Sequence, residues 1–354
     1  MGAPKLYDLF PLTMAGLGIL LTIVGLAVLM IVHEAGHHFV ARWFGMRVVR
    51  FSIGFGPPLF RVQPRGSDTV YQVALIPFLA YVQIAGMNPF EESDPNDKGS
   101  YANASLLARV LTVVAGPLAN YVFATVLFFA AFMIGGKAGE STVIEVMPDG
   151  AAQRAELHDG DKILSIDGTT TDNFEAMRKV IIANPNRPLP IKVNRGGQVL
   201  DLTVTPEPKG EHGGGVIGIT PMREPMTLRE AAWLSTIAPA LVVENLVLDL
   251  VRMFTGRVKM DELAGPVGIV KIGARTVDLG IDDFLVFMGR LSAYLGGFNL
   301  LPFPALDGGR LGFLAYEAVA RRKPNARVEA HVHALGLLMF LALMFVVSVF
   351  DIRR

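Results

Sequence analysis

Cysteine is absent from the 354 residues of this sequence. Disulfides, thiolate nucleophiles and cysteine-ligated metals are therefore excluded, and any bound metal must depend on His, Asp or Glu side chains. Charge is also scarce, because only 18% of the residues are Asp, Glu, Lys or Arg and the formal net charge is zero. A chain without excess positive charge is not expected to bind nucleic acid by bulk electrostatic attraction.

Apolar residues are abundant instead. They make up 51% of the chain, and the mean hydropathy is +0.43. Such a chain is too apolar for an ordinary soluble protein and too polar for a bundle of membrane spans alone. We therefore expect a mainly α-helical polytopic membrane protein with about four spans and at least one water-exposed module.

Two uncharged runs, Leu9–Val32 and Val110–Gly136, are each long enough for a membrane-spanning helix. A cleavable signal peptide is the alternative for the first run, although the region before it carries a single basic residue, Lys5. Two shorter runs near the C-terminus need the residues before them to reach spanning length. The predicted spans are 9–39, 106–136, 286–306 and 331–350.

A further apolar stretch at 231–254 is interrupted by Glu244, Asp249 and Arg252. We expect it to form an amphipathic helix on the membrane surface, with a fifth span as the alternative. Arginines follow the first predicted span and also separate the third from the fourth. Because loops rich in Lys and Arg remain in the cytoplasm, the region between the second and third spans is predicted to lie outside.

Two regions between the spans carry strand patterns. Residues 47–87 combine Val, Ile, Phe and Tyr with Gly-Pro and Arg-Gly turns, which predicts membrane-associated β-hairpins. Residues 140–222 are richer in charge and alternate short strand patterns with turns, which predicts an inserted α/β domain. The predicted organisation is a first membrane half at 1–139, the α/β domain at 140–222, interfacial linker helices at 223–285 and a second membrane half at 286–354.

A candidate metal motif lies at the end of the first span, where the chain has the segment HEAGH. His33 and His37 are one helical turn apart on one face, and Glu34 is adjacent to the first histidine. In this arrangement two imidazoles bind zinc and the glutamate acts as a general base. The alternative is that the histidines cap or pack the helix end, but ionisable residues at the end of a span usually have a function. His38 faces away from His33.

A catalytic zinc needs a third protein ligand. The first and third predicted spans run in the same direction, which places Asp307 on the same side of the membrane as the histidines and at similar depth. The alternative for Asp307 is a turn or helix cap within ALDGG. The rival acids are Glu91, Glu92 and Asp94 on the inner side and Asp261, Glu262, Asp282 and Asp283 on the outer side.

Several segments carry a resemblance to a known family. They are HEAGH (33–37), FSIGFGPPLF (51–60), YQVALIPF (71–78), TVVAGPLAN (112–120), LAGPVGI (263–269) and NLLPFPALDGGR (299–310). Together they resemble the site-2 protease family of intramembrane zinc metalloproteases, in its bacterial RseP-type (regulator of sigma-E protease) branch. The segment GAAQRAELHDGDKILSIDG (150–168) resembles the core of a PDZ domain, and the chain has one such module.

The resemblance implies that Zn2+ is held by His33, His37 and Asp307, and that Glu34 accepts a proton from the zinc-bound water. Asn299 would hold the substrate backbone or the oxyanion, with a helix–helix hydrogen bond as the alternative. The remaining substrate-binding candidates are Ile76 and Tyr81, on a strand able to pair with an unwound substrate, and Gly116 and Asn120, for which close helix packing is the favoured interpretation.

In the PDZ-like module, the segment GGVIGI (214–219) resembles a carboxylate-binding loop. This nominates Gly215, Val216, Ile217 and Gly218 as binders of a peptide C-terminus. A steric role, as a filter that admits only trimmed substrates, is the alternative for the module.

The sequence thus predicts a zinc-dependent intramembrane endopeptidase that cleaves transmembrane segments in regulated intramembrane proteolysis. The resemblance implies a single-span, anti-sigma-factor-like substrate already trimmed by another protease. It also implies a multi-pass protein of the bacterial inner membrane, with a periplasmic PDZ-like domain and an active site near the cytoplasmic side. The alternatives are a non-catalytic membrane scaffold that presents a PDZ module and a metal transporter.

Overall fold

The computed structural model describes residues 14–88, 94–138, 141–147, 149–209, 213–255 and 265–353. The chain divides into two compact units, which we call the helical unit (residues 1–131 and 229–354) and the inserted unit (residues 132–228).

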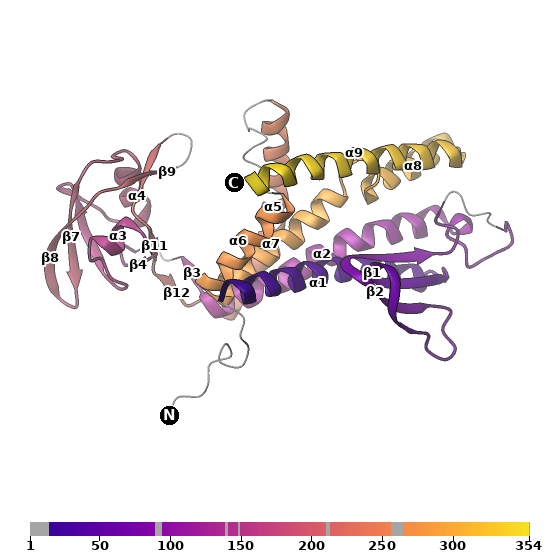
Figure 1. The fold of residues 1–354 in the computed structure, drawn as a ribbon, viewed down its shortest axis with the longest axis horizontal. Coiled ribbons are helices and arrows are strands. Elements are labelled where there is room, and N and C mark those ends of the chain that lie inside the picture. Colours follow the sequence, from indigo (N-terminus) through magenta and orange to yellow (C-terminus); the bar gives the residue numbers. More distant parts are fainter. Residues whose placement is uncertain are drawn as a thin grey trace. The chain divides into compact units, whose positions relative to one another are not determined.

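Long helices dominate the helical unit (Figure 1). In chain order they are α1 (Met14–Trp43), α2 (Leu106–Gly135), α5 (Leu228–Phe254), α6 (Pro266–Leu279), α7 (Ile281–Asn299), α8 (Asp307–Ala320) and α9 (Ala326–Arg353), and a short 3-10 helix, η2 (Tyr101–Asn103), precedes α2. Among the described residues, four segments are long and apolar enough to cross a membrane: Gly16–Trp43, Leu106–Gly135, Leu228–Met253 and Ala326–Arg353. The expected mainly helical chain with about four spans is confirmed at this level.

The identity of the third candidate span differs from the sequence prediction. The stretch at 231–254, for which we expected a surface helix, is a continuous helix that qualifies as a span. Conversely, α7 is 19 residues long and carries Asp282, Asp283 and Arg290. It therefore does not combine the length and apolarity of the other four helices, although we expected a span at 286–306. The apolar run that suggested that span continues beyond the end of α7 into an irregular segment.

Helices α1 and α2 pack closely where the metal motif lies. An added Cβ on Gly36 would clash with the backbone of Ala115, and one on Gly116 would clash with the imidazole of His37. Small residues at both positions let the two backbones approach, as is usual where helices associate in a membrane. The consequence is that α2 lies directly against the histidines of α1.

Strands β1 (Val48–Val62) and β2 (Val70–Ile84) are bent, and each contributes two segments to one small sheet, which is antiparallel except where residues 50–53 pair in parallel register with 70–73. Residues 48–53 pair with 80–84 on one side and with 70–73 on the other, while 58–62 pair with 71–74. The result is a small sheet with the order 80–84, 48–53, 70–74, 58–62, and the expected strands at 47–87 are present. Gly54 has a φ of +92° at the bend, a conformation that favours glycine.

The inserted unit is a small α/β structure. Its strands are β3 (Lys137–Ala138), β4 (Ile144–Val146), β5 (Lys162–Ile166), β6 (Thr169–Thr170), β7 (Leu189–Arg195), β8 (Gln198–Val204), β9 (Glu207–Lys209), β10 (Gly214–Val216), β11 (Ile219–Pro221) and β12 (Arg223–Glu224). The main sheet has the order β6-β5-β7-β8, and α3 (Ala151–Arg154) and α4 (Phe174–Ile182) complete the unit. Along β7 buried and exposed side chains alternate, as expected for a sheet with one face on a core.

Candidate metal centre

Three side chains from two helices converge on one point in the helical unit. The Nε2 atom of His33 lies 3.1 Å from Oδ2 of Asp307, and Nε2 of His37 lies 3.3 Å from the same oxygen. The two Nε2 atoms are 3.3 Å apart. Within the described ranges these three residues form the group that can hold a metal ion. Two imidazole nitrogens and one carboxylate oxygen are the donor set of a catalytic zinc site that keeps a position open for water.

The local sequence explains how Asp307 reaches the histidines. Helix α7 ends at Asn299 and α8 begins at Asp307, so this candidate ligand is the first residue of a helix. Pro302 and Pro304 lie between them and lack the N–H groups that would continue α7. The sequence prediction of one span through to residue 306 is therefore wrong, because the helix that carries Asn299 ends at that residue. The Asn299 amide instead donates to the carbonyl oxygen of Leu295, at 3.0 Å.

Both histidine rings are contacted by α2 on the side away from Asp307. Nδ1 of His37 donates to the carbonyl oxygen of Thr112 at 2.8 Å, and Nδ1 of His33 lies 3.1 Å from the Asn120 side-chain amide. Such partners fix the orientation and tautomer of a metal-binding imidazole. Gly116 and Asn120, which we considered for substrate contact, thus lie against the histidines. Sequence reasoning missed Thr112, because a backbone carbonyl leaves no mark on the side-chain pattern.

Glu34 faces the small sheet rather than open space. Its Oε2 accepts the backbone N–H of Val82 at 2.9 Å. Val82 lies opposite Phe51 in the β1–β2 pairing. Residues of an antiparallel strand alternate between those that hydrogen-bond to the partner strand and those whose groups face away. The N–H of Val82 points to Glu34, so the free edge of residues 80–84 faces the candidate catalytic carboxylate.

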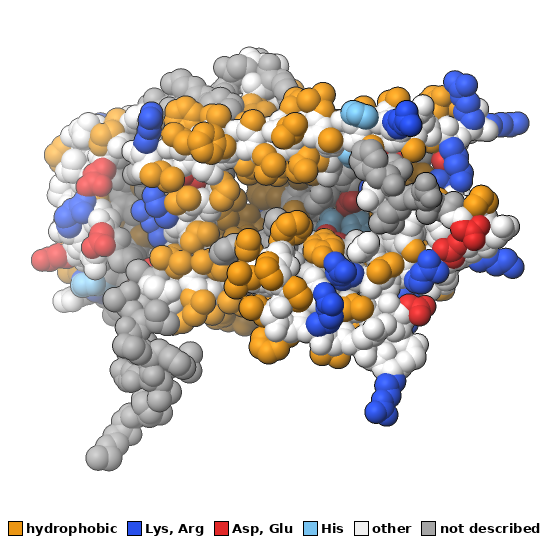
Figure 2. Space-filling view, turned by 45° about the vertical axis from the view of Figure 1, so that its right-hand side comes forward, with side chains coloured by type: hydrophobic (Ala, Val, Ile, Leu, Met, Phe, Trp, Pro, Cys, Tyr) orange, Lys and Arg blue, Asp and Glu red, His pale blue; other side chains and the backbone are white. Residues whose placement is uncertain are grey.

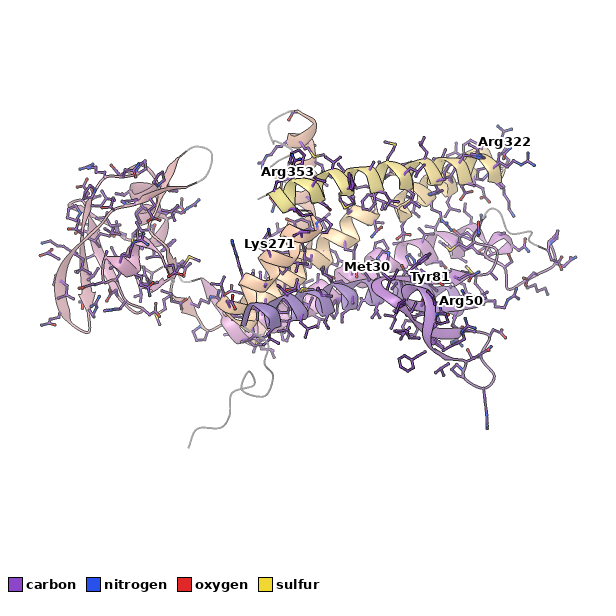
Figure 3. All side chains as sticks on the ribbon, in the orientation of Figure 1. Met30, Arg50, Tyr81, Lys271, Arg322 and Arg353 are labelled. Carbon is purple, nitrogen blue, oxygen red and sulfur yellow. The ribbon has the colours of Figure 1, made fainter. Side chains whose placement is uncertain are left out.

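The other two candidates on β2 lie apart from the metal ligands. The Tyr81 hydroxyl accepts hydrogen bonds from Arg50 and Gln72 at 3.4 and 3.5 Å, and Figure 3 shows Tyr81 and Arg50 together on the sheet. Ile76 is 49% exposed. The structure therefore does not bring these two side chains to the histidines.

A buried ion pair joins α2 to α8. Arg109 donates to both carboxylate oxygens of Glu317, at 2.9 and 2.5 Å, and both side chains are largely buried. The Arg109 guanidinium lowers the pKa of Glu317, against the opposing effect of burial. Because α8 begins at Asp307 and α2 carries the partners of both histidines, this pair connects the two halves of the site. No sequence pattern suggested it.

The rival acids do not approach the site where they are described. Asp94 lies in a turn and accepts the backbone N–H of Asn96. Asp282 and Asp283 are in the first turn of α7. Glu91, Glu92, Asp261 and Glu262 fall outside the described residues.

The candidate peptide-binding residues lie in the inserted unit. Gly215 and Val216 belong to β10, and Ile217 is buried in the core of that unit. The carbonyl oxygens of Ile217 and Gly218 accept the N–H groups of Ala152 and Met147, at 2.7 and 2.9 Å. The segment is therefore tied to the start of α3 and to the loop after β4.

A mainly helical chain with apolar helices, a His-His-Asp cluster and an adjacent glutamate defines the class of membrane metallopeptidases. A model described as peptidase family M50 matches residues 21–343. The chain belongs to this family, the site-2 protease family, and is a metalloprotease.

Relatives cover nearly the whole chain. A protein of Rhizobium meliloti named as a zinc metalloprotease is 33% identical over 90% of this chain and 91% of its own length. The zinc metalloprotease RasP of Geobacillus kaustophilus is 30% identical over 94% of this chain and 97% of its own length. A solved PDZ domain of an SdrC-like protein from Listeria innocua matches 25% of this chain and all of that chain, at 22% identity and a TM-score of 0.21. That TM-score is too low to carry an argument.

Proposed function

We propose that this chain is a zinc-dependent intramembrane endopeptidase that cleaves transmembrane segments of membrane proteins. The observation that carries the proposal is the convergence of His33, His37 and Asp307 beside Glu34, within a unit whose long helices expose large apolar side chains. His33 and His37, through Nε2, and Asp307, through Oδ2, would hold the zinc ion. When bound, it supplies Lewis acidity, which acidifies water and polarises a peptide carbonyl.

Glu34 moves the protons in the proposed reaction. Its carboxylate takes a proton from the attacking water and delivers it to the amine that leaves when the peptide bond breaks. Its position supports this role, because it is one residue from the His33 ligand. The low polarity of the surroundings strengthens each electrostatic interaction in the site.

The substrate backbone lies along the free edge of residues 80–84. A helical substrate must unwind before its peptide bonds become accessible, and an unwound segment can add to a sheet edge as a further strand. The Val82 N–H then donates its hydrogen bond to a substrate carbonyl instead of to Glu34. This change of partner frees the Glu34 carboxylate for proton transfer. In this scheme the backbone groups of Ala80 and Val82, two residues apart, form the hydrogen bonds to the substrate strand. Ile76 and Tyr81 contribute by stabilising the sheet and do not contact the substrate.

The proposed substrate is a single-span membrane protein of the anti-sigma-factor type, trimmed first by another protease. Figure 2 supports entry from the lipid, because histidine and acidic side chains are visible inside a hollow that hydrophobic side chains surround.

We assign the protein to the bacterial inner membrane, with the site near the cytoplasmic side and the inserted unit outside. In this cysteine-free chain, a cysteine at Ser67 is expected to resist an external thiol reagent and one at Ser141 to react. The reverse pattern would overturn the orientation.

We further propose that residues 140–222, which lie within the inserted unit, form a PDZ-like domain that acts as a size filter. The alternative role of the domain is to capture a new C-terminus, which its proposed peptide-binding residues, Gly215 to Gly218, would bind. Replacing residues 141–220 with a short flexible linker is expected to leave zinc bound and to permit cleavage of substrates that keep a bulky outer domain. Slower cleavage of trimmed substrates in that variant would favour C-terminal capture instead.

The central test is Glu34→Gln, which removes the base and leaves all three ligands. We expect one zinc per chain and a rate of transmembrane-segment cleavage lower by about 100- to 10,000-fold. Glu244→Gln, an exposed position on α5, is the matched control and is expected to cleave normally. Normal cleavage by Glu34→Gln would exclude the mechanism. A scaffold or a transporter predicts no cleavage by the wild-type protein either.

A further inference from the structure

The two histidines of the metal centre differ in the group that faces Nδ1, the ring nitrogen directed away from Asp307. Nδ1 of His37 faces a backbone carbonyl, the oxygen of Thr112. A carbonyl can only accept, so the proton of the neutral ring is on Nδ1 and Nε2 is left free to bind a metal. Nδ1 of His33 faces the Asn120 side chain, which can present either a donor or an acceptor.

In the structure the amide nitrogen of Asn120 lies 3.1 Å from Nδ1 of His33. An N–H donated there would require an unprotonated Nδ1, and the ring proton would then occupy Nε2. Nε2 is the atom that lies 3.1 Å from Asp307 and 3.3 Å from Nε2 of His37. A protonated Nε2 cannot bind zinc, because the metal needs that lone pair.

No second partner among the described residues holds the Asn120 amide in that orientation. Its Oδ1 is buried and has no hydrogen-bond partner among the described residues. The oxygen and nitrogen of a terminal amide are nearly equal in size, so rotation of the group by 180° exchanges them without changing the packing. After rotation Oδ1 accepts the Nδ1–H of His33, and the two histidines have equivalent partners.

We propose that Asn120 is a positioning residue that fixes the tautomer of His33 by accepting its Nδ1–H through Oδ1. This inference rests on the proposed function, in which His33 is a zinc ligand. In this arrangement α2 supplies an acceptor to each histidine, one from a backbone carbonyl and one from a side chain. Outer partners of this kind keep the metal-binding nitrogen unprotonated and the ring correctly aimed.

The backbone around Asn120 is held firmly enough for this role. Asn120 is fully buried, and its carbonyl oxygen accepts the hydroxyl of Ser292 at 2.8 Å. Gly296 permits the close approach of α7, since an added Cβ would lie 2.8 Å from the carbonyl oxygen of Pro117. Gly296 therefore lets α7 pack tightly against α2. The Asn120 side chain therefore cannot withdraw from His33 without a shift of packed helices.

The test compares two substitutions of similar size. Asn120→Asp keeps an acceptor in both rotations, whereas Asn120→Leu removes it. The measurement is the zinc dissociation constant of the full-length protein in detergent, by competition with a chelator. We expect Asn120→Leu to bind zinc about 10- to 100-fold more weakly and Asn120→Asp to remain within about threefold of wild type. Thr22→Val is the control, because Thr22 is also fully buried but its hydroxyl donates to the Gly18 carbonyl of its own helix.

Two further variants ensure that every outcome of the experiment supports or contradicts the proposal. Should Asn120→Leu fail to fold, Asn120→Ala is measured in its place with the same expectation. His33→Ala separates this inference from the proposed function. If His33→Ala loses zinc while Asn120→Leu binds it as wild type does, the positioning role is overturned and the metal site stands. If Asn120→Asp loses zinc as severely as Asn120→Leu, acceptance by Oδ1 is also wrong. If His33→Ala retains zinc, the proposed site itself fails.

Discussion

The two units of this chain differ in the balance of apolar and polar side chains that they bury. The inserted unit encloses large aliphatic residues such as Ile144, Ile163 and Leu189, each with no exposed surface. The helical unit encloses polar residues such as Thr112, Asn120 and Ser292, also with no exposed surface. Its helices expose large apolar side chains instead, most clearly along α1, α2 and α9.

This difference indicates that water surrounds the inserted unit and that lipid surrounds the helices of the helical unit. Burial of apolar surface stabilises a structure in water, where the hydrophobic effect operates. Between helices surrounded by lipid tails that driving force is absent, and small residues, close packing and buried hydrogen bonds take its place. A hydrolytic centre needs buried polar groups with defined partners, so the interior of the helical unit accommodates it and the aliphatic core of the inserted unit does not.

The largest predicted effect is the loss of zinc binding when a proposed ligand in the helical unit is removed. His33→Ala, His37→Ala and Asp307→Ala each remove one of the three proposed ligands and are expected to weaken zinc binding beyond the roughly 100-fold that loss of an outer partner causes. Metal analysis of the purified variants measures this. His158→Ala, in the inserted unit, is the control. Full zinc occupancy in Asp307→Ala would mean that the third ligand lies elsewhere.

A second prediction compares ion pairs. Glu317→Ala leaves Arg109 buried without its partner, and we expect the free energy of unfolding to fall by about 3 kcal/mol. The double variant Arg109→Met/Glu317→Leu is expected to recover most of this loss. In the inserted unit, Asp201→Ala breaks the exposed pair with Lys192 and is expected to stay within about 0.5 kcal/mol of wild type. Denaturant unfolding compares the variants, and equal costs would contradict the burial argument.

A third prediction uses two exposed valines. Val122, at the middle of α2, is 55% exposed, and Val199, on β8, is 57% exposed. If lipid surrounds α2, Val122→Lys should cost about 3 kcal/mol of insertion free energy. Val199→Lys should change stability by no more than about 0.5 kcal/mol, as is usual at a water-exposed site. Membrane-inserted yield and thermal unfolding measure the two effects, and similar costs at both sites would refute the contrast.

The smallest predicted effect concerns acid stability of the inserted unit. Burial would raise the pKa of Asp161, but the Arg195 guanidinium and the His158 backbone N–H hold that pKa below its usual range. Because the folded-state pKa is depressed, Asp161 stabilises the unit above the unfolded-state pKa of about 3.9, and this contribution is lost as pH falls through the folded-state value. Asp161→Asn is expected to lower the unfolding free energy by about 1 kcal/mol at neutral pH. Hydrogen exchange of β5 and β7 at pH 7 and pH 3 checks both points, and an unchanged acid response in the variant would contradict the assignment.

The sequence alone determined the kind of protein and the chemical core of the site. Helical spacing places His33 and His37 on one face whatever the tertiary fold, and a long apolar run reports a membrane environment by length alone. Strand and turn patterns likewise indicated the small sheet at 47–87. These features depend on residues close in the chain, so that local geometry is sufficient to predict them.

Only the tertiary structure decided how the site is assembled. The break at Pro302 and Pro304 turns Asp307 into the start of a new helix, and the Arg109–Glu317 pair holds that helix to α2. Thr112 and Asn120 face the histidines because glycines allow α1 and α2 to approach. These contacts join residues about 75 to more than 200 positions apart. Periodicity and composition carry no information about such pairs, since they depend on how packed helices align.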